Sequence, residues 1–244
     1  MKILIKRFNN ESLENNQINE YEVKNANLLQ SLIEIKKEID SSLTFRCGCK
    51  SGICGSCAVK VNGTEKLACK TNIKDNDLIE AMNNTNIIKD LVIDVSHETL
   101  LIKKLNLTIN SNIQSTEISQ ENIKNIDLQS NCILCNSCHS SCPVYEVNKE
   151  FLGPFALTRA LRYVNDKKLV NKATIVDSIQ TNGIWDCTLC SACTLVCPQG
   201  IDPKADIMQL QNISVQNGYS NPYTKNLDFN SFGNDFGGFN PNGF

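Results

Sequence analysis

The stretch CILCNSCHSSCP at residues 132–143 returns in nearly the same form at 187–198, as CTLCSACTLVCP. In both copies two residues separate successive members of the first three cysteines, three residues precede the fourth, and a proline follows it. Bacterial ferredoxins space their ligands in this way, and there the first three cysteines bind one iron-sulfur cluster while the fourth binds the other. The repeat therefore predicts a helical domain that holds two cubane clusters.

The crossing of the fourth cysteine defines two ligand sets. One set joins three cysteines of the first copy to the last cysteine of the second, namely Cys132, Cys135, Cys138 and Cys197. The other set joins the remaining cysteines of both copies, namely Cys142, Cys187, Cys190 and Cys193. Pro143 and Pro198 are expected to direct the chain away after each crossing ligand. A pair of zinc sites is the alternative, and it is disfavoured because zinc sites seldom take four cysteines from one run and then repeat the run.

A third group of cysteines precedes the repeat, in CGCKSGICGSC at 47–57 and LAC at 67–69. Four residues separate Cys49 from Cys54 and two separate Cys54 from Cys57, which is the spacing of plant-type [2Fe-2S] ligands, and Cys69 would supply the fourth thiolate. One tight loop must then bring three thiolates together. We expect its glycines to allow positive φ angles and close approach of the backbone: Gly48, Gly52 and Gly55.

Other readings of this third group are weaker. Structural zinc favours ligands in pairs on two knuckles, which a single loop with one distant ligand does not provide. A Rieske site needs two histidines, and the sequence has none before His97. Cys47 is left over, and it would replace Cys49 only by widening the gap to Cys54 from four residues to six.

The composition limits the remaining possibilities for the class of protein and its partners. The chain has 244 residues, 41% of them apolar, which is enough for a packed core. It has 24 basic and 26 acidic residues and no basic run, so nucleic acid is an unexpected partner. We expect neither a membrane span nor an export signal. With no such signal, its 13 cysteines are better explained by metal ligation than by disulfides.

The pattern along the chain predicts four segments. Residues 1–105 are expected to form an α+β unit, with a strand at 2–8, a helix at 26–39 and a strand at CAVKV, and residues 106–128 a linker. Residues 129–215 are expected to be helical, and residues 216–244 a Gly-, Asn- and Phe-rich arm. In the first helix Leu28, Leu29, Leu32, Ile33 and Ile39 should face the core. In GPFALTRALRYVND, Pro154 should start a helix that buries Leu157, Leu161 and Val164.

The order of these motifs resembles the iron-sulfur subunit of succinate dehydrogenase and fumarate reductase. The likeness extends to FRCGCKSGICGSCAVKVNG, IIKDLVID and FLGPFALTRALRYVND, and covers most of residues 1–205. It implies an N-terminal β-grasp [2Fe-2S] ferredoxin domain, an all-α ferredoxin-like domain, and clusters used in the order [2Fe-2S], [4Fe-4S], third cluster. It also implies that the chain carries electrons between an FAD-containing dicarboxylate oxidoreductase subunit and a membrane-associated partner.

The sequence departs from the common members of that family at the third cluster. Their equivalent of Cys190 is not a cysteine, and a [3Fe-4S] cluster is held by the equivalents of Cys142, Cys187 and Cys193. A fourth thiolate favours [4Fe-4S] here, with a bystander Cys190 and [3Fe-4S] as the alternative. The histidine and tryptophans of the usual quinone pocket are replaced by Thr188 and the run VYEV at 144–147. These features resemble the branch that includes methylmenaquinol:fumarate reductase.

In that branch the partner implied by the resemblance is a subunit with CCG motifs, so quinone would be met only indirectly. The expected place is a peripheral membrane complex, on the cytoplasmic side by default or the periplasmic side with a twin-arginine partner. A free-standing polyferredoxin or a heterodisulfide-reductase-like carrier is the alternative. No nucleophile, general base or phosphate loop is found, so no catalytic residue is assigned. His139 is expected to donate a hydrogen bond or face solvent, and Trp185 to shield the third cluster.

Overall fold

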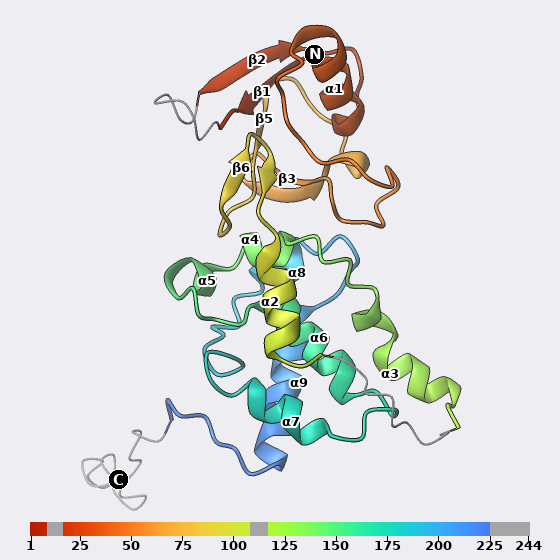
Figure 1. The fold of residues 1–244 in the computed structure, drawn as a ribbon, viewed down its shortest axis with the longest axis vertical. Coiled ribbons are helices and arrows are strands. Elements are labelled where there is room, and N and C mark those ends of the chain that lie inside the picture. The colour runs from red at the N-terminus through yellow and green to blue at the C-terminus, as the bar shows by residue number, and fades with distance from the viewer. Residues whose placement is uncertain (9–16, 108–116, 225–244) are drawn as a thin grey trace, which may run out of the picture.

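The computed structural model describes residues 1–8, 17–107 and 117–224. Figure 1 shows a sheet unit around the N-terminus and a helical unit below it, which confirms the predicted α+β class. The strands are β1 (Lys2–Lys6), β2 (Ile18–Glu22), β3 (Ala58–Val61), β4 (Thr64–Leu67), β5 (Asp77–Glu80), β6 (Ile87–Lys89) and β7 (Val92–Ile93). The sheet unit also holds α1 (Leu28–Glu34), the π-helix η1 (Ile35–Ile39) and the 3₁₀ turn η2 (Ala68–Lys70).

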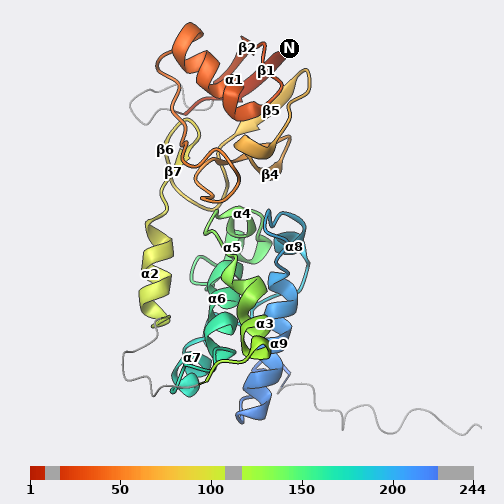
Figure 2. The same ribbon diagram turned by 90° about the vertical axis from the view of Figure 1, so that its right-hand side faces the viewer.

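The helical unit begins at α2 (Ser96–Lys104), which leaves the sheet unit and packs along α6. It continues through α3 (Gln120–Ser130), α4 (Ser137–Ser140), α5 (Pro143–Val147), α6 (Pro154–Val164), α7 (Lys172–Ser178), α8 (Ala192–Leu195) and α9 (Pro203–Gln216). Figure 2 shows α4 and α8, which follow the two cysteine turns, at the end of this unit that meets the sheet unit. The repeated motif therefore lies at the junction of the two units.

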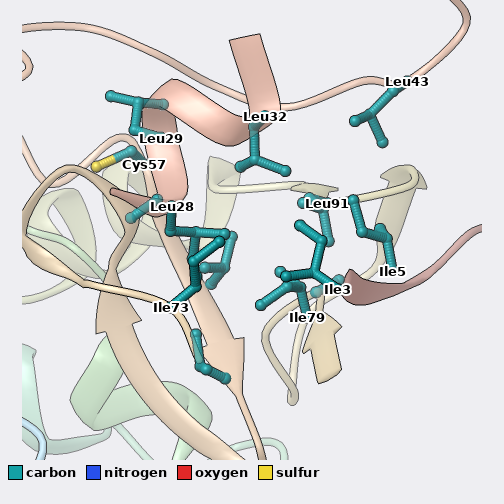
Figure 3. Close-up of a cluster of buried hydrophobic side chains, with 14 of the residues drawn as sticks. Ile3, Ile5, Leu28, Leu29, Leu32, Leu43, Cys57, Ile73, Ile79 and Leu91 are labelled. Carbon is teal, nitrogen blue, oxygen red and sulfur yellow. The ribbon is translucent and has the colours of Figure 1, made fainter. Parts of the chain in front are cut away.

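The five-stranded sheet has the order β2-β1-β5-β3-β4, with β1 and β5 parallel and the other pairs antiparallel. In β1 the alternation of lysine and apolar residues places Ile3 and Ile5 on the buried face. Figure 3 shows these side chains meeting Ile79 of β5 and leucines of α1. The β3–β4 hairpin turns at Asn62 and Gly63, both with positive φ, as the Asn-Gly pair predicts.

The first helix buries a shorter face than its sequence predicts. Leu28, Leu29 and Leu32 are buried as expected and Ile33 is half-buried, but Ile39 is 53% exposed. The cause is the change to a π-helix after Glu34, where the Asp40 N–H reaches back five residues to the Ile35 carbonyl. The wider turn shifts the last apolar residue off the core face.

A buried ion pair fixes the chain just before the first cysteine loop. Asp90, 2% exposed, accepts hydrogen bonds from the Arg7 Nε at 2.8 Å and from the Thr44 N–H at 2.8 Å. Arg7 also donates to Asp40 and to the Tyr21 hydroxyl. The carboxylate of Asp90 thus ties β1 to the segment that enters the loop at Cys47 to Cys57.

Helix α6 is the centre of the helical unit. Pro154 is its first residue, and Leu157, Leu161 and Val164 are buried, as predicted. Helices α3, α7 and α9 pack around it. Within the predicted linker, residues 120–128 are already helical, because Ser119 and Asn122 form a capping box at the start of α3. Residues 108–116 of that linker lie outside the described residues.

The start of the predicted C-terminal arm is held against the helical unit. After α9 the Tyr223 hydroxyl donates to the Asp186 carboxylate at 2.6 Å, next to Cys187. The part of that segment from 225 to 244 lies outside the described residues.

A hydrogen-bonded seam joins the sheet unit to α4. The Asn83 N–H donates to the Ser140 hydroxyl at 2.8 Å, and that hydroxyl donates to the buried Glu65 carboxylate at 2.7 Å. The side-chain amide of Asn84 lies 3.1 to 3.2 Å from the carbonyls of His139, Ser140 and Cys142. These contacts tie the carbonyl groups at the end of α4 to the sheet unit.

The first cysteine loop packs directly on the first cysteine turn of the helical unit. A Cβ atom built on Gly55, whose φ is +71°, would come within 2.9 Å of the Cys135 Cβ and of the Ile133 carbonyl oxygen. The Gln199 side chain donates to the Gly52 carbonyl at 3.1 Å, so the segment after Pro198 holds the same loop. The units meet where their cysteines lie.

Replacing Arg7 by methionine should lower the free energy of unfolding by about 3–5 kcal/mol, because it leaves the buried Asp90 charge uncompensated. The control is Lys2→Met, which removes the exposed pair with Glu20 and should cost about 0–1 kcal/mol. Urea unfolding of both variants followed by circular dichroism measures the difference. Equal midpoints would contradict a structural role for the Arg7–Asp90 pair.

Gly55→Ala should destabilise the protein more than Gly63→Ala. Both glycines have positive φ, so each substitution costs about 1–2 kcal/mol of backbone strain. Only at position 55 does the new methyl group meet another segment, which adds about 1–3 kcal/mol of overpacking. The thermal midpoints of the two variants should separate accordingly, and matching midpoints would show that the loops do not pack closely.

Candidate metal centres

The two copies of the repeated motif have the same unusual backbone. In the first copy Leu134 and Asn136 have φ of 52° and 63°, and in the second copy Leu189 and Ser191 have φ of 55° and 70°. These residues stand two and four places after the first cysteine of each copy. Alternating right- and left-handed residues turn successive N–H groups toward one point, which forms a binding site for an anionic group. A non-glycine residue in this region is strained, and strain is typical of functional sites.

The first predicted ligand set surrounds a single cavity. Cys132, Cys135, Cys138 and Cys197 all line it, together with mostly apolar neighbours that include Phe155 and Ile201. Burial raises the pKa of the first three of these thiols, and their mutual repulsion as anions raises it further. A positively charged iron cluster offsets both effects, since a coordinated thiol is deprotonated. The donors and their surroundings therefore fit a cubane cluster.

The second predicted set is also brought together. Cys193 feels the charges of Cys187, Cys142 and Cys190, and Cys187 feels those of Cys142 and Cys190. Burial, followed by these neighbours, raises the pKa of Cys193 to about 12. Cys142 and Cys193 are buried, whereas Cys190 is exposed. The fourth thiol of this set thus lies at its solvent side.

The loop of the first cysteine group surrounds its sulfur atoms with N–H donors. The Cys49 sulfur accepts from the N–H groups of Ser51, Ile53 and Cys54 at 3.3 to 3.4 Å. Hydrogen bonds from the Ser51 side chain and then from these N–H groups lower the pKa of Cys49 to about 5. Such donors stabilise a thiolate and a reduced cluster alike.

The rest of that group follows the expected pattern in part. Burial raises the pKa of Cys57 to about 11, and Cys69 is its neighbour. Gly52 and Gly55 have positive φ, as predicted, but Gly48 does not. Gly48 serves close approach instead, since a Cβ there would lie 2.8 Å from the Cys54 sulfur. Cys47 is exposed and no sulfur contact of the described residues involves it.

The three groups lie in order through the molecule. In chain order, the first site is that of Cys49, the second is that of Cys132 and the third is that of Cys187. The first site meets the second at Gly55 and Cys135, and Cys138 of the second site feels the charge of Cys193 in the third. Across residues 1–8, 17–107 and 117–224, no three His, Cys, Asp or Glu side chains gather closely enough to hold one metal ion.

The structure corrects the expectation for His139. It is fully buried, and both of its ring nitrogens lack a hydrogen-bond partner among the described residues. Its ring lies between His97, at 4.4 Å, and Tyr145, at 3.9 Å, measured between ring centroids. Burial lowers the pKa of His139 to about 3, so the ring is neutral at pH 7. Packing against two rings takes the place of the expected hydrogen bond or solvent contact, and the sequence gives no signal for it.

Trp185 is half-buried against the core of the helical unit, and its indole N–H donates to Gln180 at 2.9 Å. Arg46, which flanks the first cysteine loop in the sequence, donates to the Ile93 carbonyl at 2.9 Å. Shielding of the third site by Trp185 stays a prediction.

Family models divide the chain as the motifs do. Residues 2–99 match the 2Fe-2S iron-sulfur cluster binding domain, and residues 129–201 match the 4Fe-4S dicluster domain. A chain of the Mycobacterium smegmatis Sdh1 complex in the apo form has the same fold, with a TM-score of 0.77 and 23% identity over 90% of this chain and 97% of that one.

Two relatives extend the match to most of the sequence. The fumarate reductase iron-sulfur subunit of Haemophilus influenzae is 34% identical over 232 residues, which are 86% of this chain and 91% of that protein. The 8-methylmenaquinol:fumarate reductase iron-sulfur subunit of Wolinella succinogenes is 34% identical over 206 residues, which are 78% of this chain and 65% of that protein. The chain therefore belongs to the family of succinate dehydrogenase and fumarate reductase iron-sulfur subunits, the electron-transfer subunits of these oxidoreductase complexes.

Proposed function

We propose that three clusters form a single electron path through this chain. A [2Fe-2S] cluster would be held by Cys49, Cys54, Cys57 and Cys69, a [4Fe-4S] cluster by Cys132, Cys135, Cys138 and Cys197, and a third cluster by Cys142, Cys187, Cys190 and Cys193. The observation that carries the proposal is the continuity of these sets, through Gly55 on Cys135 and through Cys138 beside Cys193.

When bound, the clusters accept and donate single electrons. The residues of this chain hold the clusters and set their potentials. Backbone N–H groups around Cys49 stabilise negative charge at the first site. Apolar residues around the cavity of Cys132, Cys135, Cys138 and Cys197 keep water out and lower the local dielectric constant. The dicarboxylate chemistry belongs to a separate FAD-containing subunit.

The third cluster is proposed to be [4Fe-4S]. Cys190 stands beside Cys187 and Cys193 in the charge interactions of this site, where it would serve as the ligand of a fourth iron. A [3Fe-4S] centre usually has a higher potential than a [4Fe-4S] centre, so with [4Fe-4S] at this site the terminal carrier would work at a lower potential.

The partners are proposed to be the flavoprotein and a membrane-associated subunit of the divergent branch, with CCG motifs. Thr188 and the run VYEV at 144–147, which take the places of usual quinone-pocket residues, support this choice, as does the additional cysteine at position 190. None of the helices among the described residues has both the length and the apolar character needed to cross a bilayer, so a further subunit would make the membrane contact. The proposed location of the complex is the cytoplasmic side of the membrane, or the periplasmic side if the chain is exported with a twin-arginine partner.

We also propose that the sheet unit has the β-grasp ferredoxin topology. The five-stranded sheet with α1 packed on one face is compatible with the β-grasp ferredoxin topology. The proposed domain limits at 105 and 129 lie after α2 and inside α3, so α2 falls in the first proposed domain although it contacts α6 of the helical unit.

Purification under anaerobic conditions tests the function directly. The chain should copurify with an FAD protein, and the complex should contain iron and acid-labile sulfide in the amounts required by three clusters. Reduced material should give electron paramagnetic resonance signals of [2Fe-2S] and [4Fe-4S] centres. A stable monomer without a flavoprotein would support the polyferredoxin alternative, and zinc without sulfide would overturn the proposal.

Cys190→Ala should convert the third cluster to [3Fe-4S], because the fourth iron loses its thiolate. The oxidised variant should then give a [3Fe-4S] signal, its iron content should fall, and the midpoint potential of this centre should rise. The matched control is Cys47→Ala, which changes another exposed cysteine and should alter none of these properties. A full [3Fe-4S] signal in undamaged wild-type protein would contradict the role of Cys190.

A further inference from the structure

Asn136 links the second cysteine site to the first turn of α2. It is 3% exposed, has a left-handed backbone and stands between Cys135 and Cys138. Its side-chain oxygen accepts from the His97 Nε2 at 2.9 Å, and its side-chain nitrogen donates to the Glu98 carboxylate. The carboxylate is thereby fixed beside the turn that carries the predicted ligands.

Glu98 also borders a cavity between the first two sites. The cavity has a volume of about 300 Å³, and its lining includes Cys54 of the first loop, Cys135 of the second and the polar side chains of Arg46 and Ser56. A space of this size has room for several water molecules. Water in this space would give a proton a path to the carboxylate that avoids the apolar cavity of Cys132, Cys135, Cys138 and Cys197.

Burial, and not the charges around it, prepares the Glu98 carboxylate to take up a proton. Burial raises its pKa above the ordinary value of 4.5, while the Asn136 hydrogen bond and the charge of Arg46 oppose this. Next to Glu98 in α2, burial lowers the pKa of His97 and keeps its ring neutral. Just before α2, the Asp94 carboxylate accepts a hydrogen bond from the Ser96 N–H. The groups that line the same cavity from other segments are Arg46 and the thiols of Cys54 and Cys135.

An electron that enters the second site adds one negative charge to a half-buried region. A nearby anion is destabilised by that charge, and protonation removes the repulsion. We propose that Glu98 takes up a proton from the cavity when the second site takes up an electron. The electron comes from the neighbouring carrier, the proton comes from solvent, and the only bond formed is the O–H bond of the carboxylic acid.

This inference rests on the proposed ligand set of the second site, and it has a definite sign. Reduction raises the pKa of Glu98, so between its oxidised-state and reduced-state pKa values each electron brings one proton. By linkage, the midpoint potential falls as pH rises through that window, and is flat on either side. A tenfold change in proton concentration shifts the potential of a one-electron couple by about 59 mV. The midpoint potential should therefore fall by up to about 59 mV per pH unit within that window.

The experiment is a redox titration of the holoenzyme complex at a series of pH values, followed by electron paramagnetic resonance. Wild type, Glu98→Gln and the control Glu121→Gln are compared, where Glu121 is exposed on α3. Glutamine at 98 keeps an oxygen that accepts from Asn136, so the turn should remain intact. Iron and sulfide are measured in each sample.

One [4Fe-4S] potential of wild type and of the control should fall with rising pH, and Glu98→Gln should abolish that slope. Flat wild-type potentials overturn the inference whether or not the variant folds, as does a slope that survives in Glu98→Gln. Full iron and sulfide content together with pH-independent potentials would contradict only this inference. Protein without clusters would contradict the proposed function instead.

Discussion

Several thiols gathered in a poorly hydrated place form the constraint on which the rest of this structure depends. Each buried cysteine of the two sets in the helical unit resists ionisation, because burial disfavours the charged form and neighbouring sulfurs repel one another as anions. The proposed clusters would reverse this balance by placing iron among the sulfurs. Folding of the helical unit around α6 and loading of these clusters would then be linked equilibria.

The two cysteine turns also carry backbone strain. Leu134, Leu189 and Ser191 take left-handed conformations that such residues avoid, at about 1–2 kcal/mol each, whereas Asn136 adopts this conformation more readily. Apolar packing of α6 with α3, α7 and α9 provides the stability that offsets this strain. The turns are held by their surroundings rather than by their own propensity, and so they present a fixed set of N–H groups and sulfurs.

The sheet unit contributes to the cubane sites although none of their ligands comes from it. Asn83 and Asn84 bind the end of α4, and Gly55 lies against Cys135. Asn136 in turn is held by His97 and Glu98 of α2. Close contact between loops is what an electron carrier needs, since transfer requires neighbouring clusters at a fixed separation. The interface thus serves stability and conduction with the same atoms.

The sequence alone determined the α+β class and the start of α6 at Pro154, because strand alternation and a proline at the first helical position are local signals. Cysteine spacing, also a local signal, predicted the proposed ligand groups. The π-helix that exposes Ile39 is a local change that the apolar spacing does not predict. Tertiary structure decided the remainder. The burial of His139 beside His97 and the packing of Gly55 on Cys135 depend on segments far apart in the chain. So does the setting of Glu98, whose partner stands 38 residues away. Spacing along a chain specifies which atoms can share a turn, whereas contacts between distant turns depend on how the whole core packs.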